Sequence, residues 1–297
     1  MKRRLATLAL LATAAAWGAT FTMVKNVIAK MAPEAFIFWR FLVAAVVLLG
    51  VVFLRRRWRR GSAMNGTNGT YGTYESHSSH RSHESHASLL PGVILGLLIF
   101  GAYWTQTRGL MTISPSRSAF LTGLYVVLVP FLQGKVKRNA WIAAGLALLG
   151  TIVLVGKPQG SAAIGDALTI ACALFSAFHV VYAARFTTQD TATGLAAIQV
   201  AFVALAAAPF AAFSPPVAWS ASIVSVILFT AIVTTALAFA ALMWGQAHVS
   251  ATEAAVILSF EPVAAAITSI AFYGEPMTAA FLIGAALILA AMLLSQL

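Results

Sequence analysis

The chain has 297 residues, of which 60% are hydrophobic and 9% are charged, and its mean hydropathy is +0.88. A water-soluble globule of this length needs far more polar surface, so the composition excludes that class and indicates a protein solvated by lipid. The net charge of +11 does not indicate a nucleic-acid partner, because the basic residues lie between hydrophobic runs instead of forming one patch.

Hydrophobic runs long enough to span a bilayer, which takes roughly 20 residues, recur along the whole chain. They predict an all-α integral membrane protein with about ten transmembrane helices, at residues 5–24, 34–54, 91–110, 115–134, 139–156, 163–184, 192–213, 219–245, 250–273 and 278–296. The N-terminus also has the order of a secretory signal, with a small-residue cleavage site at Ala14 to Ala16. The apolar run continues through Val24, however, and this length favours a span.

The basic residues between the predicted spans are distributed unevenly. One side of the membrane receives 13 of the 19, namely Lys2, Arg3, Arg4, the five arginines within 55–60, Arg81, Lys135, Lys137, Arg138 and Arg185. The opposite side receives Lys25, Lys30, Arg108 and Lys157. Because positive loops stay on the cytoplasmic side, the asymmetry predicts a multi-pass protein of the cell (inner) membrane with both termini cytoplasmic.

Residues 65–88 repeat with a period of three, in the form Asn, Tyr or His, then any residue, then Thr or Ser. With almost no apolar residues, this segment predicts a disordered cytoplasmic loop over 61–88. Its histidines at 77, 80, 83 and 86 could bind a metal ion opportunistically, but their spacing in a loop does not define a metal site. The single cysteine, Cys172, lies within a hydrophobic run, so we expect a buried thiol, no intrachain disulfide and no cofactor.

The two halves of the chain, 1–156 and 157–297, share a pattern. Tyr103-Trp104-Thr105-Gln106 near the end of the third span parallels Met243-Trp244-Gly245-Gln246 near the end of the eighth, and the following spans each contain a proline, Pro130 or Pro262. Because each half has five spans, an odd number, the second half must enter the membrane from the opposite face. Such inverted repeats are a transporter architecture, with the substrate site near the midplane.

The sequence resembles the EamA-type permeases of the drug/metabolite transporter superfamily over nearly its whole length, residues 61–88 excepted. The resemblance is carried by Trp17-Gly18-Ala19-Thr20-Phe21, Arg40-Phe41, the stretch from Ser114 to Pro130, Ser259-Phe260-Glu261-Pro262-Val263, Gly274-Glu275-Pro276 and Gly284. It implies ten helices in two EamA-like repeats, a central cavity and export of amino acids or related amphipathic metabolites. The sequence departs from the family pattern in two places. It has Gln133-Gly134 where the family often has a Gly-Glu pair, and it has the extra loop at 65–88.

Two ionisable residues lie inside predicted spans. Glu261 is near mid-bilayer, where exposing a charge to lipid costs on the order of 3 kcal/mol or more, so it must face a cavity or a partner. It is a candidate for carrying a coupling proton, because a carboxyl group can bind and release one. The alternative is a hydrogen-bonded packing residue. Arg40 is a candidate anchor for a substrate carboxylate or an ion-pair partner, unless it extends to the outer interface.

Aromatic residues supply the other candidates. Trp17 and Phe21 share one face of the first span, and Phe175, Phe178, His179 and Tyr182 follow the spacing of one helix face in the sixth. Such residues line either a binding cavity or a helix contact. His179 could bind a proton or be a satisfied core histidine, and Trp244 and Gln246 near the end of the eighth span complete the candidate set.

The combined pattern predicts a secondary transporter, with a membrane-embedded enzyme or a channel as the alternatives. The sequence has no nucleotide-binding P-loop, so transport would be driven by a gradient or by exchange. The expected partners are a small-molecule substrate and the lipid bilayer, with proton coupling as an option. We expect no catalytic residues, no metal and no nucleic acid.

Overall fold

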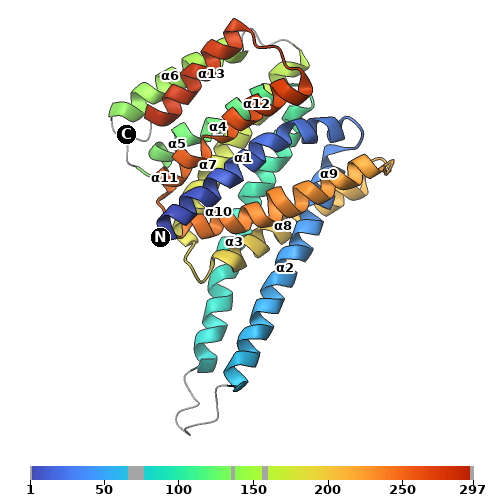
Figure 1. Cartoon of the computed structure of the whole chain (residues 1–297), viewed down its shortest axis with the longest axis vertical. Coiled ribbons are helices and arrows are strands. Elements are labelled where there is room, and N and C mark those ends of the chain that lie inside the picture. The colour runs from blue at the N-terminus through green and yellow to red at the C-terminus, as the bar shows by residue number, and fades with distance from the viewer. Residues whose placement is uncertain (1, 66–76, 135–137, 156–159, 295–297) are drawn as a thin grey trace.

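The computed structural model describes residues 2–65, 77–134, 138–155 and 160–294, and every regular element in these ranges is a helix. The helices are α1 (Lys2–Ile28), α2 (Pro33–Asn65), α3 (His77–Leu110), α4 (Pro115–Gly123), α5 (Tyr125–Leu132), α6 (Arg138–Val155), α7 (Ser161–Phe186), α8 (Ala192–Ala212), α9 (Ala221–Ala231), η1 (Ile232–Leu237), α10 (Ala238–Gln246), α11 (Ala251–Leu258), α12 (Glu261–Tyr273) and α13 (Ala279–Leu294). Eight helical segments are long and apolar enough to cross a membrane, and two shorter apolar helices, α6 and α13, complete the set (Figure 1). The predicted all-α membrane fold is confirmed.

Three of the spans are interrupted. The fourth consists of α4 and α5, the eighth of α9, η1 and α10, and the ninth of α11 and α12. Pro262 explains the last break, because a proline lacks the N–H that would bond the carbonyl four residues earlier. That carbonyl belongs to Leu258, the final residue of α11. The eighth span is interrupted without a proline, by the π-helical turn η1.

The two halves of the chain pack against each other over most of their length. The most extensive helix contacts, α2 with α8, α3 with α7 and α8, α6 with α13, and α1 with α12, all join the first half to the second. Glycines allow close approach at these crossings, as is common between membrane helices. A Cβ added to Gly150 of α6 would lie 2.9 Å from the carbonyl oxygen of Gly284 in α13. These two helices lie side by side at one edge of the molecule (Figure 1).

The helices α2 and α3 extend beyond the hydrophobic runs that predicted them, as Figure 1 shows. α2 continues to Asn65 and α3 begins at His77, so parts of the range predicted as a disordered loop, 61–65 and 77–88, are helical. The physical reason is that extending an existing helix adds one hydrogen bond per residue, whereas starting one is costly. Residues 66–76 lie outside the described part of the chain.

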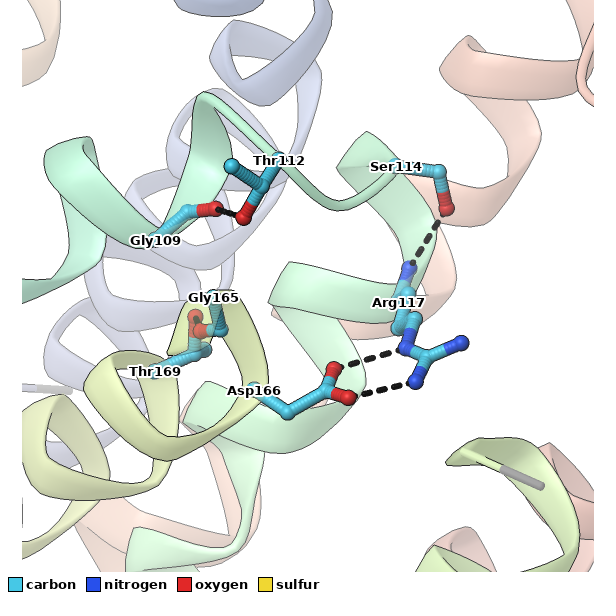
Figure 2. A network of polar contacts seen from close by, with 7 residues as sticks. All are labelled: Gly109, Thr112, Ser114, Arg117, Gly165, Asp166 and Thr169. Atoms are coloured by element: carbon cyan, nitrogen blue, oxygen red, sulfur yellow. Dashed lines mark hydrogen bonds and ion pairs between the residues drawn. The ribbon is translucent and has the colours of Figure 1, made fainter. Parts of the chain in front are cut away.

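The first turn of α4 is held by polar contacts to both halves. Arg117 forms two hydrogen bonds with Asp166 at the start of α7, of 2.7 and 2.5 Å, and its backbone N–H donates to the capping hydroxyl of Ser114 (Figure 2). The Glu275 carboxylate accepts hydrogen bonds from the Ser114 hydroxyl and from the backbone N–H of Ser116. This end of α4 is therefore fixed to α7 and to the segment between α12 and α13.

Candidate functional site

A cavity lies between the two halves of the protein. It contains about 810 Å³ of space not occupied by atoms, a volume that includes its open mouth. The lining residues are Trp17, Thr20, Phe21, Val24, Arg40, Ile99, Ala102, Tyr103, Gln106, Thr107, Leu110, Thr122, Tyr125, Cys172, Ser176, His179, Val180, Phe239, Leu242, Leu258 and Glu261. The lining residues of α1 and α3 lie in the C-terminal halves of those helices, whereas most of those of α7 lie in the C-terminal half of a helix that ends at the face where α1 begins, since Lys2 donates to Gln189 just after α7. We call that face the N-terminal face.

Arg40 is buried and all its described hydrogen-bond partners are neutral. Nε donates to the Thr235 hydroxyl at 2.7 Å, and Nη2 donates to the hydroxyl and carbonyl oxygens of Thr234 at 3.1 and 3.3 Å and to the Tyr103 hydroxyl at 3.4 Å. The guanidinium also lies 4.9 Å from the centre of the Tyr103 ring, in cation–π geometry. Nη1 donates to none of the described residues, so one end of the guanidinium remains available to a ligand.

Glu261 is buried at the first position of α12 and lines the same cavity. Among the described residues, no hydrogen bond or ion pair engages its carboxyl group. Its backbone lies against α1, because a Cβ added at Gly18 would be 2.4 Å from the Glu261 carbonyl oxygen. The helix break before Pro262 and the glycine in α1 therefore place the carboxyl group at the cavity.

The polar side chains on α7 form a third part of the site. His179 shares a hydrogen bond of 2.8 Å with Gln199 of α8, and both residues are buried. Cys172 and Ser176 lie on the same face of α7, with their Sγ and Oγ atoms 3.8 Å apart. The remaining wall is apolar. It includes Trp17 and Phe239, whose ring centres are 5.6 Å apart.

The structure brings five of the ten predicted site residues together at the cavity, namely Trp17, Phe21, Arg40, His179 and Glu261. The other five lie outside its lining. Phe175 packs over Gly101 of α3, Tyr182 stacks on Phe186, Trp244 contacts His248, Gln246 donates to the Val180 carbonyl at 3.1 Å, and Phe178 is half-buried.

The aromatic residues on α7 cover a wider part of the helix surface than the cavity face does, so not all of them line the cavity. The cavity face of that helix follows the spacing of residues 172, 176, 179 and 180. Phe175 and Phe178 each precede a lining residue by one position, so their side chains point about 100° away from that residue and lie off the cavity face. A pattern of residues three and four apart identifies one side of a helix, but it does not identify which residues on that side line a cavity.

Several lining residues were not among the sequence predictions. Tyr103, Gln106 and Thr122 contribute polar groups, and the Gln106 amide donates to the Thr122 hydroxyl at 3.1 Å. The available signal was polarity within an apolar span, which Gln106 shows. Tyr125 and Phe239 carried no such signal, because an aromatic residue in a membrane helix is typical of packing.

Among the residues that the structure describes, no group of three or more His, Cys, Asp or Glu side chains is placed to hold a metal ion. The side chains of the four loop histidines lie outside that part.

The fold and cavity define a multi-spanning membrane protein with a cavity lined by residues of both halves. The model of the EamA-like transporter family matches the chain twice, over residues 4–156 and 163–297, and the chain belongs to this family. It is 28% identical to an uncharacterized transporter of Archaeoglobus fulgidus over 303 residues, covering 100% of this chain and 87% of that protein. A crystal structure with 19% sequence identity has the same fold, with a TM-score of 0.68 over 98% of this chain and 96% of its own. The protein is therefore a membrane transporter.

Proposed function

We propose that this transporter carries amino acids or related small amphipathic metabolites that bear both a negative and a positive group. The observation that supports this most is the pair of ionisable residues in the cavity. Arg40 and Glu261 line the same space, yet neither forms an ion pair with the other or with another described residue. Groups of opposite charge buried without partners are costly, and a zwitterion would engage both.

The groups that line the cavity suit the different parts of such a substrate. The free Nη1 of Arg40 can donate to a carboxylate, and a hydrogen bond of this kind is charge-assisted. The Glu261 carboxylate can accept from an ammonium group. The apolar wall that includes Trp17, Phe21 and Phe239 leaves room for an apolar or aromatic side chain.

We expect the physiological direction to be export, which is the direction that the resemblance to EamA-type permeases implies. The excess of basic residues predicts that the N-terminal face is cytoplasmic in the cell membrane. Polar contacts join the helices at both faces: Arg3 pairs with Glu253 at the N-terminal face, and Arg117 bonds Asp166 at the opposite one.

Coupling would use the same acidic residue or the substrate itself. When no substrate ammonium is present, a proton can neutralise Glu261, so the two cations would compete for one carboxylate. This competition gives proton-coupled antiport. The alternative consistent with the same cavity is exchange of one substrate for another.

A flux assay in proteoliposomes tests the proposal with three probes of similar shape. They are L-phenylalanine, phenethylamine, which lacks the carboxylate, and hydrocinnamate, which lacks the ammonium group. We expect L-phenylalanine to be favoured, Arg40→Gln to abolish the preference over phenethylamine, and Glu261→Gln to abolish the preference over hydrocinnamate. Asp190→Asn, which removes an exposed acidic group outside the cavity, is the control. Unchanged preferences in both cavity variants would show that the charged pair does not recognise the substrate.

A further inference from the structure

The π-helical turn η1 lies next to Arg40 and changes which backbone carbonyls are left without a partner inside the helix. At its end, the Ala238 N–H bonds the carbonyl oxygens of Thr235 and Val233. An α-helical N–H at this position would bond the Thr234 carbonyl, four residues earlier. The Thr234 carbonyl oxygen accepts instead from Trp17 Nε1 at 2.7 Å and from Arg40 Nη2 at 3.3 Å. The turn therefore supplies a buried acceptor to two cavity residues.

The same turn brings two adjacent hydroxyl groups to one side. Thr234 and Thr235 both donate to the Thr230 carbonyl, at 3.0 and 2.9 Å. In an α-helix a threonine hydroxyl reaches the carbonyl three or four residues earlier. A contact five residues back, as Thr235 makes, follows from the wider π turn. With their protons used on Thr230, both hydroxyl oxygens can accept from the guanidinium.

The result is a fixed orientation of Arg40. Nε and Nη2 bind η1, and Nη1 has no described partner. A guanidinium is planar and rigid, so holding one edge determines where the remaining N–H groups point. The anchoring groups on η1 come from the second half of the chain, and Tyr103, which accepts from Nη2 at 3.4 Å, comes from the first half, to which Arg40 itself belongs.

We propose that Thr234 and Thr235 of the π turn are positioning residues that orient Arg40 toward the anionic group of the substrate. The inference rests on the proposed function, in which Arg40 receives a carboxylate. It adds that selectivity for this carboxylate depends on two threonines, neither of which lines the cavity.

The test uses Thr235→Val, which keeps the shape of the side chain and removes the acceptor, and Thr235→Ser, which restores it. Thr235→Ala replaces the valine variant if the latter does not fold. The control is Thr151→Val in α6, because the Thr151 hydroxyl also donates to a backbone carbonyl of its own helix, at 2.8 Å, but has no contact with Arg40. The readout is the ratio of KM values for phenethylamine and L-phenylalanine in proteoliposomes. General damage to the protein would affect both probes, whereas loss of orientation affects only the one with a carboxylate.

We expect Thr235→Val to reduce this ratio about tenfold, as for loss of one hydrogen bond to a charged group. Thr235→Ser should restore the ratio to within about twofold, and Thr151→Val should leave it unchanged. If Arg40→Gln abolishes the preference while Thr235→Val keeps it, the positioning role is wrong and the proposed function stands. If Arg40→Gln itself keeps the preference, the assignment of Arg40 fails, and the role of the π turn fails with it.

Discussion

The crossing of α1 and α12 at Gly18 determines where Glu261 lies, and Gly18→Ala tests this directly. A Cβ at this position would be 2.4 Å from the Glu261 carbonyl oxygen, 2.7 Å from the Ala264 Cβ and 2.8 Å from the Ala265 backbone nitrogen. Two of these neighbours are backbone atoms, which no side-chain rotation can move away. To reach ordinary van der Waals contact, the helices must separate by roughly 1 Å.

The expected energetic effect combines two opposing terms. Alanine is favoured over glycine within a helix by about 0.5–1 kcal/mol. Overpacking costs about 1–3 kcal/mol and more where backbone must shift. We therefore expect Gly18→Ala to lower the free energy of unfolding by about 1–2 kcal/mol. Because the displaced backbone carries Glu261, the substrate flux per folded protein should also fall.

Gly145→Ala is the matched control, because Gly145 is also helical and a Cβ there would meet nothing within 4 Å. It should preserve or slightly raise stability and leave flux unchanged. The assays are thermal unfolding of both purified variants in detergent and substrate flux in proteoliposomes. Equal melting temperatures and equal flux for the two variants would refute the close crossing of α1 and α12.

Three further predictions address other parts of the molecule. Asp166→Asn should lower the free energy of unfolding by about 2 kcal/mol, which is less than the loss expected for a fully buried ion pair because Arg117 is partly exposed. Arg3→Gln, which breaks an exposed pair, should change the free energy of unfolding little. Chemical denaturation measures both, and a larger loss for Arg3→Gln than for Asp166→Asn would contradict the prediction. Glu261→Gln should still exchange substrate but lose its response to an imposed pH gradient, and full pH-driven flux in this variant would exclude the coupling role. Replacing residues 65–88 with a glycine-serine linker of equal length should leave flux nearly unchanged, and loss of flux with normal membrane insertion would indicate a regulatory role.

The spans were predictable because lipid imposes a simple rule on the sequence. A helix that crosses the bilayer needs a long apolar run, and all ten predicted runs contain helices in the structure. Arg40, His179 and Glu261 could be identified for the same reason, since an ionisable side chain within an apolar run needs a cavity or a partner. The helical extensions of α2 and α3 had no apolar signal, so the sequence predicted a loop there.

The π turn and the cavity face of α7 could not be predicted in this way. Residues 232–237 read Ile-Val-Thr-Thr-Ala-Leu, without a proline or glycine to mark an irregular turn. The Thr234 carbonyl accepts hydrogen bonds from Trp17 and Arg40, which are about 200 residues away in the sequence, so only the tertiary structure reveals this role. Likewise, the pairing of α7 with α3 packs Phe175 over Gly101, a contact that the periodicity of α7 alone does not contain.

A structure of the transporter with its best-transported amino acid bound would test the central claim most directly. The account predicts that the substrate carboxylate lies within hydrogen-bonding distance of Arg40 Nη1, that the ammonium group lies beside the Glu261 carboxylate, and that Arg40 remains bonded to Thr234 and Thr235. A substrate bound in the cavity with neither charged group near these two side chains would contradict it.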